Sequence, residues 1–246
     1  MERKVIILAA GKGVRMNVAI PKVLTPVNGK PMIEYALSAV EKICKPVVIV
    51  GYKGADVEQF IGNRADFVWQ VEQLGTGHAV ACARELLSNF TGGIMVLYGD
   101  HPLITTRTID QLFELHEKET ATISLMTTVV PDFEAWREGF TSFGRILRDS
   151  GGKISGIREV KDCTEKEKNI HEVNPGYYCF DSQWLWANID KIKNKNNQKE
   201  YYLTDLIEIA VSEREKIVSL KIDAKECLGI NTKEQLSFVE KILKGI

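Results

Sequence analysis

The sequence predicts an α/β fold in which a mostly parallel sheet carries helices on both faces and continues into a small mixed β extension. In the first half of the chain, short apolar runs rich in β-branched residues alternate with segments of helical spacing, which is the pattern of strand–helix–strand units. In the second half, strand-like runs follow one another with fewer helices between them. This second pattern favours mixed or antiparallel pairing beside the parallel core.

Each element is predicted from its own local pattern. Buried, β-branched runs predict strands over residues 5–10, 47–50, 67–71, 94–98, 122–130, 144–148, 153–160, 176–180 and 217–222. Helical spacing predicts helices over residues 32–43, 56–61, 76–87, 105–118, 182–192, 203–212 and 232–243. Pro31 marks the first turn of one helix, and Thr105 or Thr106 is expected to cap another. Residues 191–200, rich in Lys and Asn, predict a solvated loop. The order of elements is Rossmann-like.

Length and charge limit the kind of protein this is. A chain of 246 residues fits one large α/β domain, or a domain with a small appended lobe. Its 32 basic and 33 acidic residues nearly cancel, which indicates no nucleic-acid or membrane partner but is compatible with a small anionic ligand. No segment approaches the roughly 18 consecutive apolar residues that span a bilayer. The five cysteines are scattered and odd in number, which is typical of reduced thiols in a cytoplasmic protein.

Two glycines and several cations follow the first predicted strand. Gly11 and Gly13 allow the backbone to approach a ligand closely, and successive N–H groups in such a loop can bind an anion. Lys12, Arg15 and Lys22 add positive charge, and the Arg15 guanidinium can contact two phosphate oxygens at once. The loop therefore predicts a polyphosphate site, with a tight turn and solvated cations as the alternative.

A carboxylate ends the predicted strand over residues 94–98. Tyr98, Gly99 and Asp100 lie where ligands bind in open α/β sheets, beyond the carboxyl ends of the strands. Mg²⁺ usually keeps several waters and takes one or two protein oxygens, so Asp100 is a candidate metal ligand. The alternative is an aspartate that caps the turn before Pro102.

A polar segment between residues 70 and 79 precedes a predicted helix. The amide of Gln70 can present a donor and an acceptor to a pyrimidine edge. Gly75 and Gly77 would let a flat base lie against the backbone. Thr76 could cap the helix instead of binding a ligand, and His78 considered alone indicates a structural role.

Together these segments resemble the sugar-nucleotide pyrophosphorylases, and most closely the N-acetylglucosamine-1-phosphate uridylyltransferases. The similar segments occur in the family's order and comprise residues 8–16, 21–33, 70–79, 94–103, 143–146, 157–162, 172–178, 200–205 and 229–232. The resemblance implies a transfer of UMP from UTP to N-acetylglucosamine 1-phosphate with Mg²⁺ as cofactor. UTP and the sugar 1-phosphate would be the partners, without nucleic acid or membrane.

The resemblance also implies a set of site residues in this chain. Arg15, Lys22 and Asp100 would be catalytic, and Asp100 with Asn231 would hold the metal. Substrate-binding roles are implied for Leu8, Ala9, Ala10, Gly11, Gly13, Gln70, Gln73, Gly75, Thr76, Tyr98, Gly99, Gly144, Glu159, Asn174, Tyr202, Thr204 and Asn231.

Several positions depart from the family's pattern. Val14 replaces a frequent Thr, His101 a smaller or apolar residue, and Pro175 a small hydroxyl residue that would also keep its N–H. Thr232 and Lys233 replace Asn-Arg. These departures leave open a nucleotidyltransferase of the same fold with another sugar phosphate or nucleotide, and, from another class, a non-catalytic nucleotide-binding regulatory or scaffold protein. The glycine pattern disfavours a Rossmann dehydrogenase.

The bifunctional members of the family continue into a left-handed β-helix that carries acetyltransferase activity and trimer contacts. The hexapeptide repeats of such a helix are not found in this sequence. We therefore expect residues 1–246 to form one nucleotidyltransferase domain without acetyltransferase activity, as a monomer or a dimer.

Overall fold

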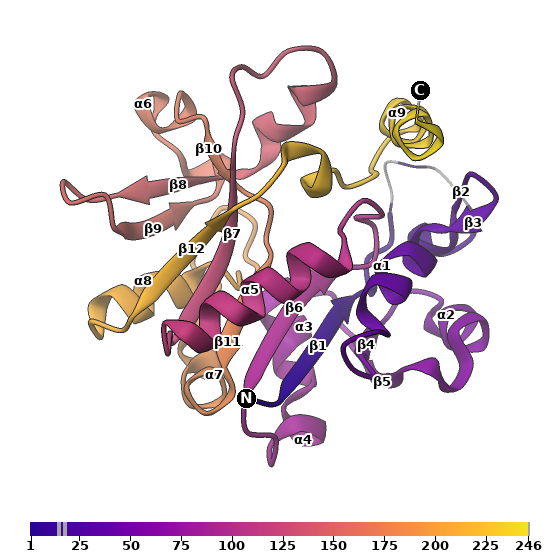
Figure 1. Ribbon diagram of the computed structural model, residues 1–246, viewed down its shortest axis with the longest axis horizontal. Helices are drawn as coiled ribbons and strands as arrows, with labels where there is room; N and C mark the ends of the chain where they lie inside the picture. The colour runs from indigo at the N-terminus through magenta and orange to yellow at the C-terminus, as the bar shows by residue number, and fades with distance from the viewer. Residues whose placement is uncertain (14–15, 17–18, 246) are drawn as a thin grey trace.

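The computed structural model describes residues 1–13, 16 and 19–245. In this part of the chain, ten strands form one sheet in the order β5-β4-β1-β6-β11-β7-β10-β8-β9, with β12 paired to β7 (Figure 1). Its strands are β1 Arg3–Leu8, β4 Val47–Val50, β5 Asp66–Trp69, β6 Gly93–Tyr98, β7 Ile123–Val129, β8 Gly144–Arg148, β9 Ile154–Arg158, β10 Glu172–Asn174, β11 Tyr178–Asp181 and β12 Ile217–Lys221. The strands β2 Pro26–Val27 and β3 Lys30–Pro31 form a separate hairpin.

The predicted division of the sheet is confirmed. Strands β5, β4, β1 and β6 pair in parallel, so their carboxyl ends meet at one edge. Strand β11 then runs antiparallel to both β6 and β7. Beyond β7, the strands β10, β8 and β9 pair antiparallel and form the predicted extension, which lies at the upper left of Figure 1.

Helices cover both faces of the sheet. Along β1, Ile6 and Leu8 face one core and Val5 and Ile7 face the other, because successive strand residues point to opposite sides. Helices α3 Thr76–Cys82, α7 Ser182–Asn188 and α8 Asp205–Ser212 pack on the first side, and α1 Met32–Val40, α2 Gly54–Ile61 and α5 Thr106–Lys118 on the second. The remaining α-helices are α4 Arg84–Leu87, α6 Glu165–Lys168 and α9 Lys233–Lys244.

A third apolar cluster joins the C-terminal helix to the rest of the molecule. Trp136 from the 3-10 helix Ala135–Ser142 stacks on Phe238 of α9, with ring centroids 5.4 Å apart. Asn28 in the β2–β3 turn donates to Glu240 of α9 from both its backbone and its side chain. The residues just before α9 are therefore held close to the beginning of the chain.

The structure corrects some of the predicted boundaries. The predicted helix over residues 76–87 is divided at Ala83 into α3 and α4. The predicted helix over 182–192 ends as an α-helix at Asn188 and continues as a 3-10 turn. Strand β10, helix α6 and the β2–β3 hairpin were not predicted, since each is only two to four residues long and shows no period.

Side-chain caps explain where helices α5 and α9 begin. Thr105 accepts from the Thr108 N–H, which confirms one of the two expected caps. Thr232, rather than Asn231, is the N-cap of α9, and it forms a capping box with Gln235. The Thr at position 232, a departure from the family's pattern, thus has a structural role.

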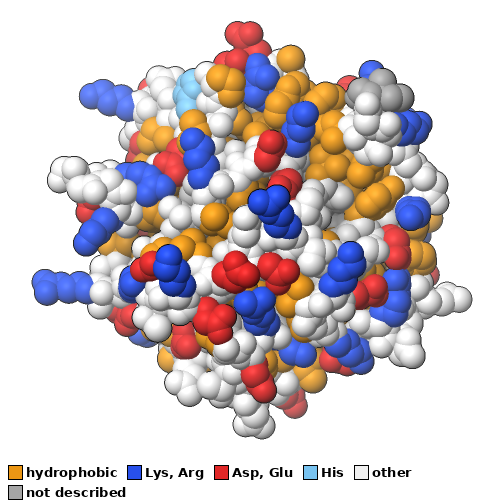
Figure 2. All heavy atoms as spheres, in the orientation of Figure 1, with side chains coloured by type: hydrophobic (Ala, Val, Ile, Leu, Met, Phe, Trp, Pro, Cys, Tyr) orange, Lys and Arg blue, Asp and Glu red, His pale blue; other side chains and the backbone are white. Residues whose placement is uncertain are grey.

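On the face drawn in Figure 2, Lys and Arg side chains alternate with Asp and Glu, and this face has no continuous basic surface. Within the described ranges, no helix combines the length and the apolar character that crossing a membrane requires.

Candidate active site

Two adjoining cavities lie where the parallel strands end. The larger, of about 900 Å³, is bounded by the segments that follow β1, β5 and β6. The smaller, of about 280 Å³, shares Thr76, Tyr98 and Glu159 with it. The predicted residues that line the larger cavity are Leu8, Ala9, Ala10, Gly11, Gly13, Lys22, Gln70, Gln73, Gly75, Thr76, Tyr98, Asp100, Glu159 and Asn231. Gly144, Asn174, Tyr202 and Thr204 line the smaller.

One predicted residue among those that the structure describes, Gly99, is not brought to these walls. Gly99 packs on the opposite side of the strand end, where a Cβ would stand 3.3 Å from Val23 and 3.4 Å from Ile33. A direct ligand contact at Gly99 is therefore not supported. Arg15, like Val14, lies outside the described residues, so its predicted role stays a prediction.

Lys22, Asp100 and Asn231 converge in the larger cavity. The Lys22 ammonium is nearly buried and donates to Asp100 Oδ2 and, at 2.7 Å, to Asn231 Oδ1. Asn231 is held there by the backbone of the preceding residue, because Ile230 N donates to the Asp100 carbonyl at 3.0 Å. Burial alone would raise the pKa of Asp100, but the charge of Lys22 and the hydrogen bonds to the carboxylate together outweigh burial, and the pKa is lowered. Asp100 is therefore ionised near neutral pH.

The glycine at position 13 is required by this lysine. Gly13 has φ +61°, and a Cβ there would stand 2.5 Å from the Lys22 Cβ. A Cβ on Gly11, by contrast, would meet no atom within 4 Å. Of the two loop glycines, Gly11 borders open space in the cavity, and Gly13 lets the loop close over Lys22.

Gln70 lies at one end of the larger cavity with its amide fixed. The side-chain Nε2 donates to the Gly75 carbonyl at 3.0 Å and is 3.1 Å from His78 Nδ1. Both protons of the amide nitrogen are thus used within the protein, and Oε1 is left as an acceptor. His78 has the structural role that its isolated position in the sequence indicated.

The glycines beside Gln70 pack against another segment of the chain. A Cβ on Gly75 would stand 2.6 Å from the Tyr201 carbonyl oxygen, and one on Gly77 would stand 3.0 Å from it. Gly77 N also donates to that carbonyl at 2.8 Å. These glycines therefore admit the 201–203 backbone, while the contact of a base with Gly75, which lines the cavity, stays a prediction. Thr76 does not cap α3; its hydroxyl accepts from Leu203 N at 3.1 Å.

The other end of the site is formed by Glu159 and its neighbours. Thr204 donates its hydroxyl proton to Glu159 Oε1 at 3.3 Å, and a Cβ on Gly144 would stand 3.4 Å from the same oxygen. Burial raises the pKa of Glu159. Asn174 accepts from Gly176 N at 3.0 Å and donates to the Tyr178 hydroxyl at 2.6 Å, so one amide proton of Asn174 is left for a ligand.

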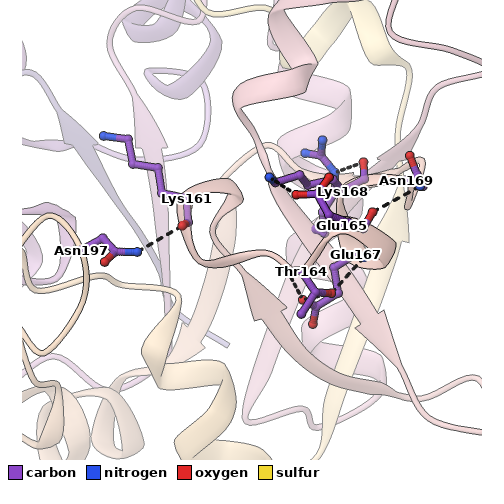
Figure 3. A network of polar contacts seen from close by, with 8 residues as sticks. Lys161, Thr164, Glu165, Glu167, Lys168, Asn169 and Asn197 are labelled. Carbon is purple, nitrogen blue, oxygen red and sulfur yellow. Dashed lines mark hydrogen bonds and ion pairs between the residues drawn. The ribbon is translucent and has the colours of Figure 1, made fainter.

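Sequence reasoning missed four polar residues in the wall of the larger cavity: Ser142, Lys161, Gln198 and Glu200. Residues 191–200, predicted as a solvated loop, fold against the segment after β9. Figure 3 shows Asn197 donating to the Lys161 carbonyl, at 3.1 Å. Lys161 Nζ in turn donates to Gln198 Oε1 at 2.5 Å, and Gln198 Nε2 to the Tyr202 hydroxyl at 2.6 Å. One feature of the sequence could have indicated these loop residues: the loop directly precedes residues 200–205, one of the segments that resemble the family.

The donor set at Asp100 and Asn231 fits a magnesium ion. In the described ranges, no three His, Cys, Asp or Glu side chains are grouped to hold a metal. One carboxylate and one amide oxygen do converge on a single cation, the Lys22 ammonium. Mg²⁺ keeps several waters and uses few protein oxygens, so this pair has the right chemistry for it, whereas Zn²⁺ sites usually include nitrogen or sulfur ligands.

The fold is that of solved nucleotidyltransferase structures. A solved UDP-glucose pyrophosphorylase complexed with UDP-glucose aligns with 100% of this chain and 99% of its own, with a TM-score of 0.78 and 20% sequence identity. At that identity the likeness shows the fold alone. The family of MobA-like NTP transferase domains matches residues 5–148, and the chain belongs to this family.

Two curated relatives are similar over nearly the whole chain. The Bifunctional protein GlmU of Geotalea daltonii is 40% identical over 97% of this chain, and that of Heliobacterium modesticaldum is 43% identical over 99%. The chain spans about half of each relative, 52% of its length. The family resemblance predicted from the motifs is confirmed by these matches.

Proposed function

We propose that this chain transfers UMP from UTP to N-acetylglucosamine 1-phosphate, giving UDP-N-acetylglucosamine and pyrophosphate. The observation that carries the proposal is the convergence of Lys22, Asp100 and Asn231 inside a cavity that extends from Gln70 to Glu159. A fixed amide at one end, charged groups in the middle and hydroxyl-binding groups at the other end match a base, phosphates and a sugar. The relatives that share the chain's whole length support the same assignment.

The fixed amide of Gln70 supports a uracil base. Its Oε1 is the group left to bond a ligand, because Nε2 is used by Gly75 and His78. Uracil carries a proton on N3 that Oε1 can accept, whereas cytosine has only a lone pair on N3. The site should therefore prefer UTP over CTP, since a pair of facing acceptors would be left unsatisfied.

The reaction needs positioning and charge neutralisation rather than a covalent nucleophile. An oxygen of the sugar phosphate attacks the α-phosphorus of UTP in line. The new O–P bond forms as the bond from the α-phosphorus to the bridging oxygen breaks, and pyrophosphate leaves with that electron pair. Lys22, beside the Gly11–Gly13 loop, neutralises charge on the phosphates, a role in which the predicted Arg15 would assist.

Asp100 and Asn231 are the residues proposed to hold Mg²⁺, which when bound supplies positive charge to the phosphate oxygens. Binding of the ion would displace the Lys22 ammonium from its place between them and free it for a phosphate. Glu159, Thr204 and Asn174 would bond the sugar, with Tyr202 at the same wall. A cytoplasmic location, where the cysteines stay reduced, and a single domain over residues 1–246 are parts of the same proposal.

A different sugar phosphate is the alternative with a specific observation in its favour. Pro175 lines the smaller cavity and offers no N–H, while the neighbouring Gly176 N is already bonded to Asn174. A sugar phosphate that forms fewer hydrogen bonds with this wall, such as one without the acetamido group, would fit the smaller cavity as well.

The proposal is tested by incubating the chain with UTP, Mg²⁺ and N-acetylglucosamine 1-phosphate and identifying the product by chromatography. UDP-N-acetylglucosamine from the wild type, with a loss of about 10²-fold or more in Asp100→Ala, is the expected result. Asp110→Asn, which removes a carboxylate paired with Arg3 outside the site, is the matched control. UTP binding without any product would favour the scaffold alternative.

A further inference from the structure

His101 lies in a tightly packed space directly after Asp100. Its ring stacks on Tyr98, with centroids 5.0 Å apart, and meets Tyr177 edge-on at 5.4 Å. On the remaining side, a Cβ on Gly229 would stand 2.5 Å from Nε2. The ring is therefore held in one place between three segments, and the chemical question is which of its two nitrogens carries the proton.

A chain of two hydrogen bonds answers that question. The Tyr177 hydroxyl is 2.7 Å from His101 Nδ1 and 2.9 Å from the Glu226 carbonyl oxygen. A carbonyl oxygen can only accept, so the single hydroxyl proton of Tyr177 is donated to Glu226. His101 Nδ1 must then donate to the Tyr177 oxygen. In a neutral imidazole this leaves Nε2 with a lone pair and no proton.

The unprotonated nitrogen faces the candidate metal ligand. Nε2 is 3.7 Å from Asp100 Oδ1, and two acceptors cannot bond one another. The Asp100 carboxylate is consequently hydrogen-bonded to the Lys22 ammonium and not to His101. With the opposite tautomer, an N–H on Nε2 would point at Oδ1, and a small movement would turn it into a hydrogen bond that competes with a cation for Asp100.

We propose that Tyr177 is a positioning residue which holds the proton of His101 on Nδ1 and thereby keeps the Asp100 carboxylate open to a divalent cation. The proposal rests on the proposed function, in which Asp100 and Asn231 bind that cation. It gives a reason for a fully buried tyrosine that is hydrogen-bonded to the imidazole facing Asp100. Outer groups of this kind tune metal affinity by orienting the ligands that touch the metal.

The experiment is a cycle of four proteins: wild type, Tyr177→Phe, His101→Val and the double variant. Mn²⁺ affinity is measured by electron paramagnetic resonance, with the protein alone and with saturating UTP. Tyr177→Phe should weaken Mn²⁺ binding roughly 10-fold when His101 is present. In the His101→Val background the same change should have less than about a twofold effect, because no imidazole remains to rearrange. Tyr35→Phe, which removes a hydroxyl bonded to the Val27 carbonyl outside the site, is the matched control.

Nitrogen-15 NMR of the imidazole gives an independent readout. The wild type should carry the His101 proton on Nδ1 and Tyr177→Phe should carry it on Nε2, which a purely packing role of Tyr177 would not produce. An equal loss of Mn²⁺ affinity in both backgrounds, no loss in either, or a wild-type proton on Nε2 would overturn the proposal. No Mn²⁺ binding by the wild type would remove the metal site itself, whereas failure confined to Tyr177→Phe leaves the proposed function intact.

Discussion

Lys22 Nζ donates to Asn231 Oδ1 at 2.7 Å, although 209 residues separate the two in the chain. The contact joins the first loop of the parallel core to the segment before the last helix. Asp100 completes the group from the end of β6. Side chains from three separate segments of the chain therefore meet at the Lys22 ammonium group.

Replacing Lys22 by Ala should lower kcat about 10²-fold, because the phosphates lose a preorganised positive charge and Asp100 loses its ion pair. Pyrophosphate release at saturating UTP measures the effect. Lys30→Ala is the control, since Lys30 is an exposed lysine of the neighbouring hairpin. A folded Lys22→Ala variant that keeps wild-type turnover would remove Lys22 from the mechanism.

Glu159→Gln should raise KM for the sugar phosphate about 10-fold or more and change KM for UTP little, because Glu159 lies at the end of the cavity away from Gln70. An amide keeps the shape but loses charge-assisted hydrogen bonds to sugar hydroxyls. Steady-state kinetics with each substrate varied in turn separates the two constants. Equal changes in both would show that Glu159 does not discriminate between the substrates. Glu165→Gln, at an exposed carboxylate of α6, is the control.

Asp205 should make stability depend on pH. Burial, with the charge of Glu208 as the next cause, raises its pKa from 3.8 to about 6. The folded state therefore binds the proton of Asp205 more tightly than the unfolded state does. The resulting contribution to the free energy of unfolding is fully present below pH 3.8 and is lost as the pH rises through about 6. Relative to wild type, Asp205→Asn should gain melting temperature between pH 4 and pH 7, and the gain should level off above. A difference that stays constant across this range would contradict the raised pKa.

Thr232→Ala should lower the free energy of unfolding by about 1 kcal/mol, because it removes the N-cap of α9 and half of its capping box. Urea unfolding measures the loss. Thr232→Ser keeps the hydroxyl and should stay close to wild type. If Ser and Ala destabilise the chain equally, the hydroxyl is not the stabilising group.

The parallel core was predictable because its central strands are apolar and largely buried and its helices are amphipathic, so both leave recognisable patterns in the sequence. Residues 47–50 were predicted without error, since a run of four buried β-branched residues allows little else. The small elements were not predictable. Strand β10 is fixed by pairing with β7 and β8, and α6 by a capping box on a four-residue helix.

The site was predictable where motifs follow strands, and less so where the tertiary structure supplies the wall. Asp100 and Gln70 could be placed from the strand that precedes each. The packing of the Tyr201 backbone against Gly75 could not be predicted, because the two residues are distant in sequence. Gln198 was missed because polar loop residues carry no period, and its contacts with Lys161 and Tyr202 bring it to the cavity.

The measurement that tests the central claim most directly is pyrophosphate release with Mg²⁺ from UTP, CTP, GTP, ATP and dTTP, each paired with N-acetylglucosamine 1-phosphate and with glucose 1-phosphate. Release confined to UTP with the acetylated sugar is the predicted result. Pyrophosphate release with CTP as fast as with UTP would contradict the proposal that Gln70 Oε1 selects uracil. Release from no pair, by a folded chain that binds UTP, would contradict the proposal that the chain is a catalyst.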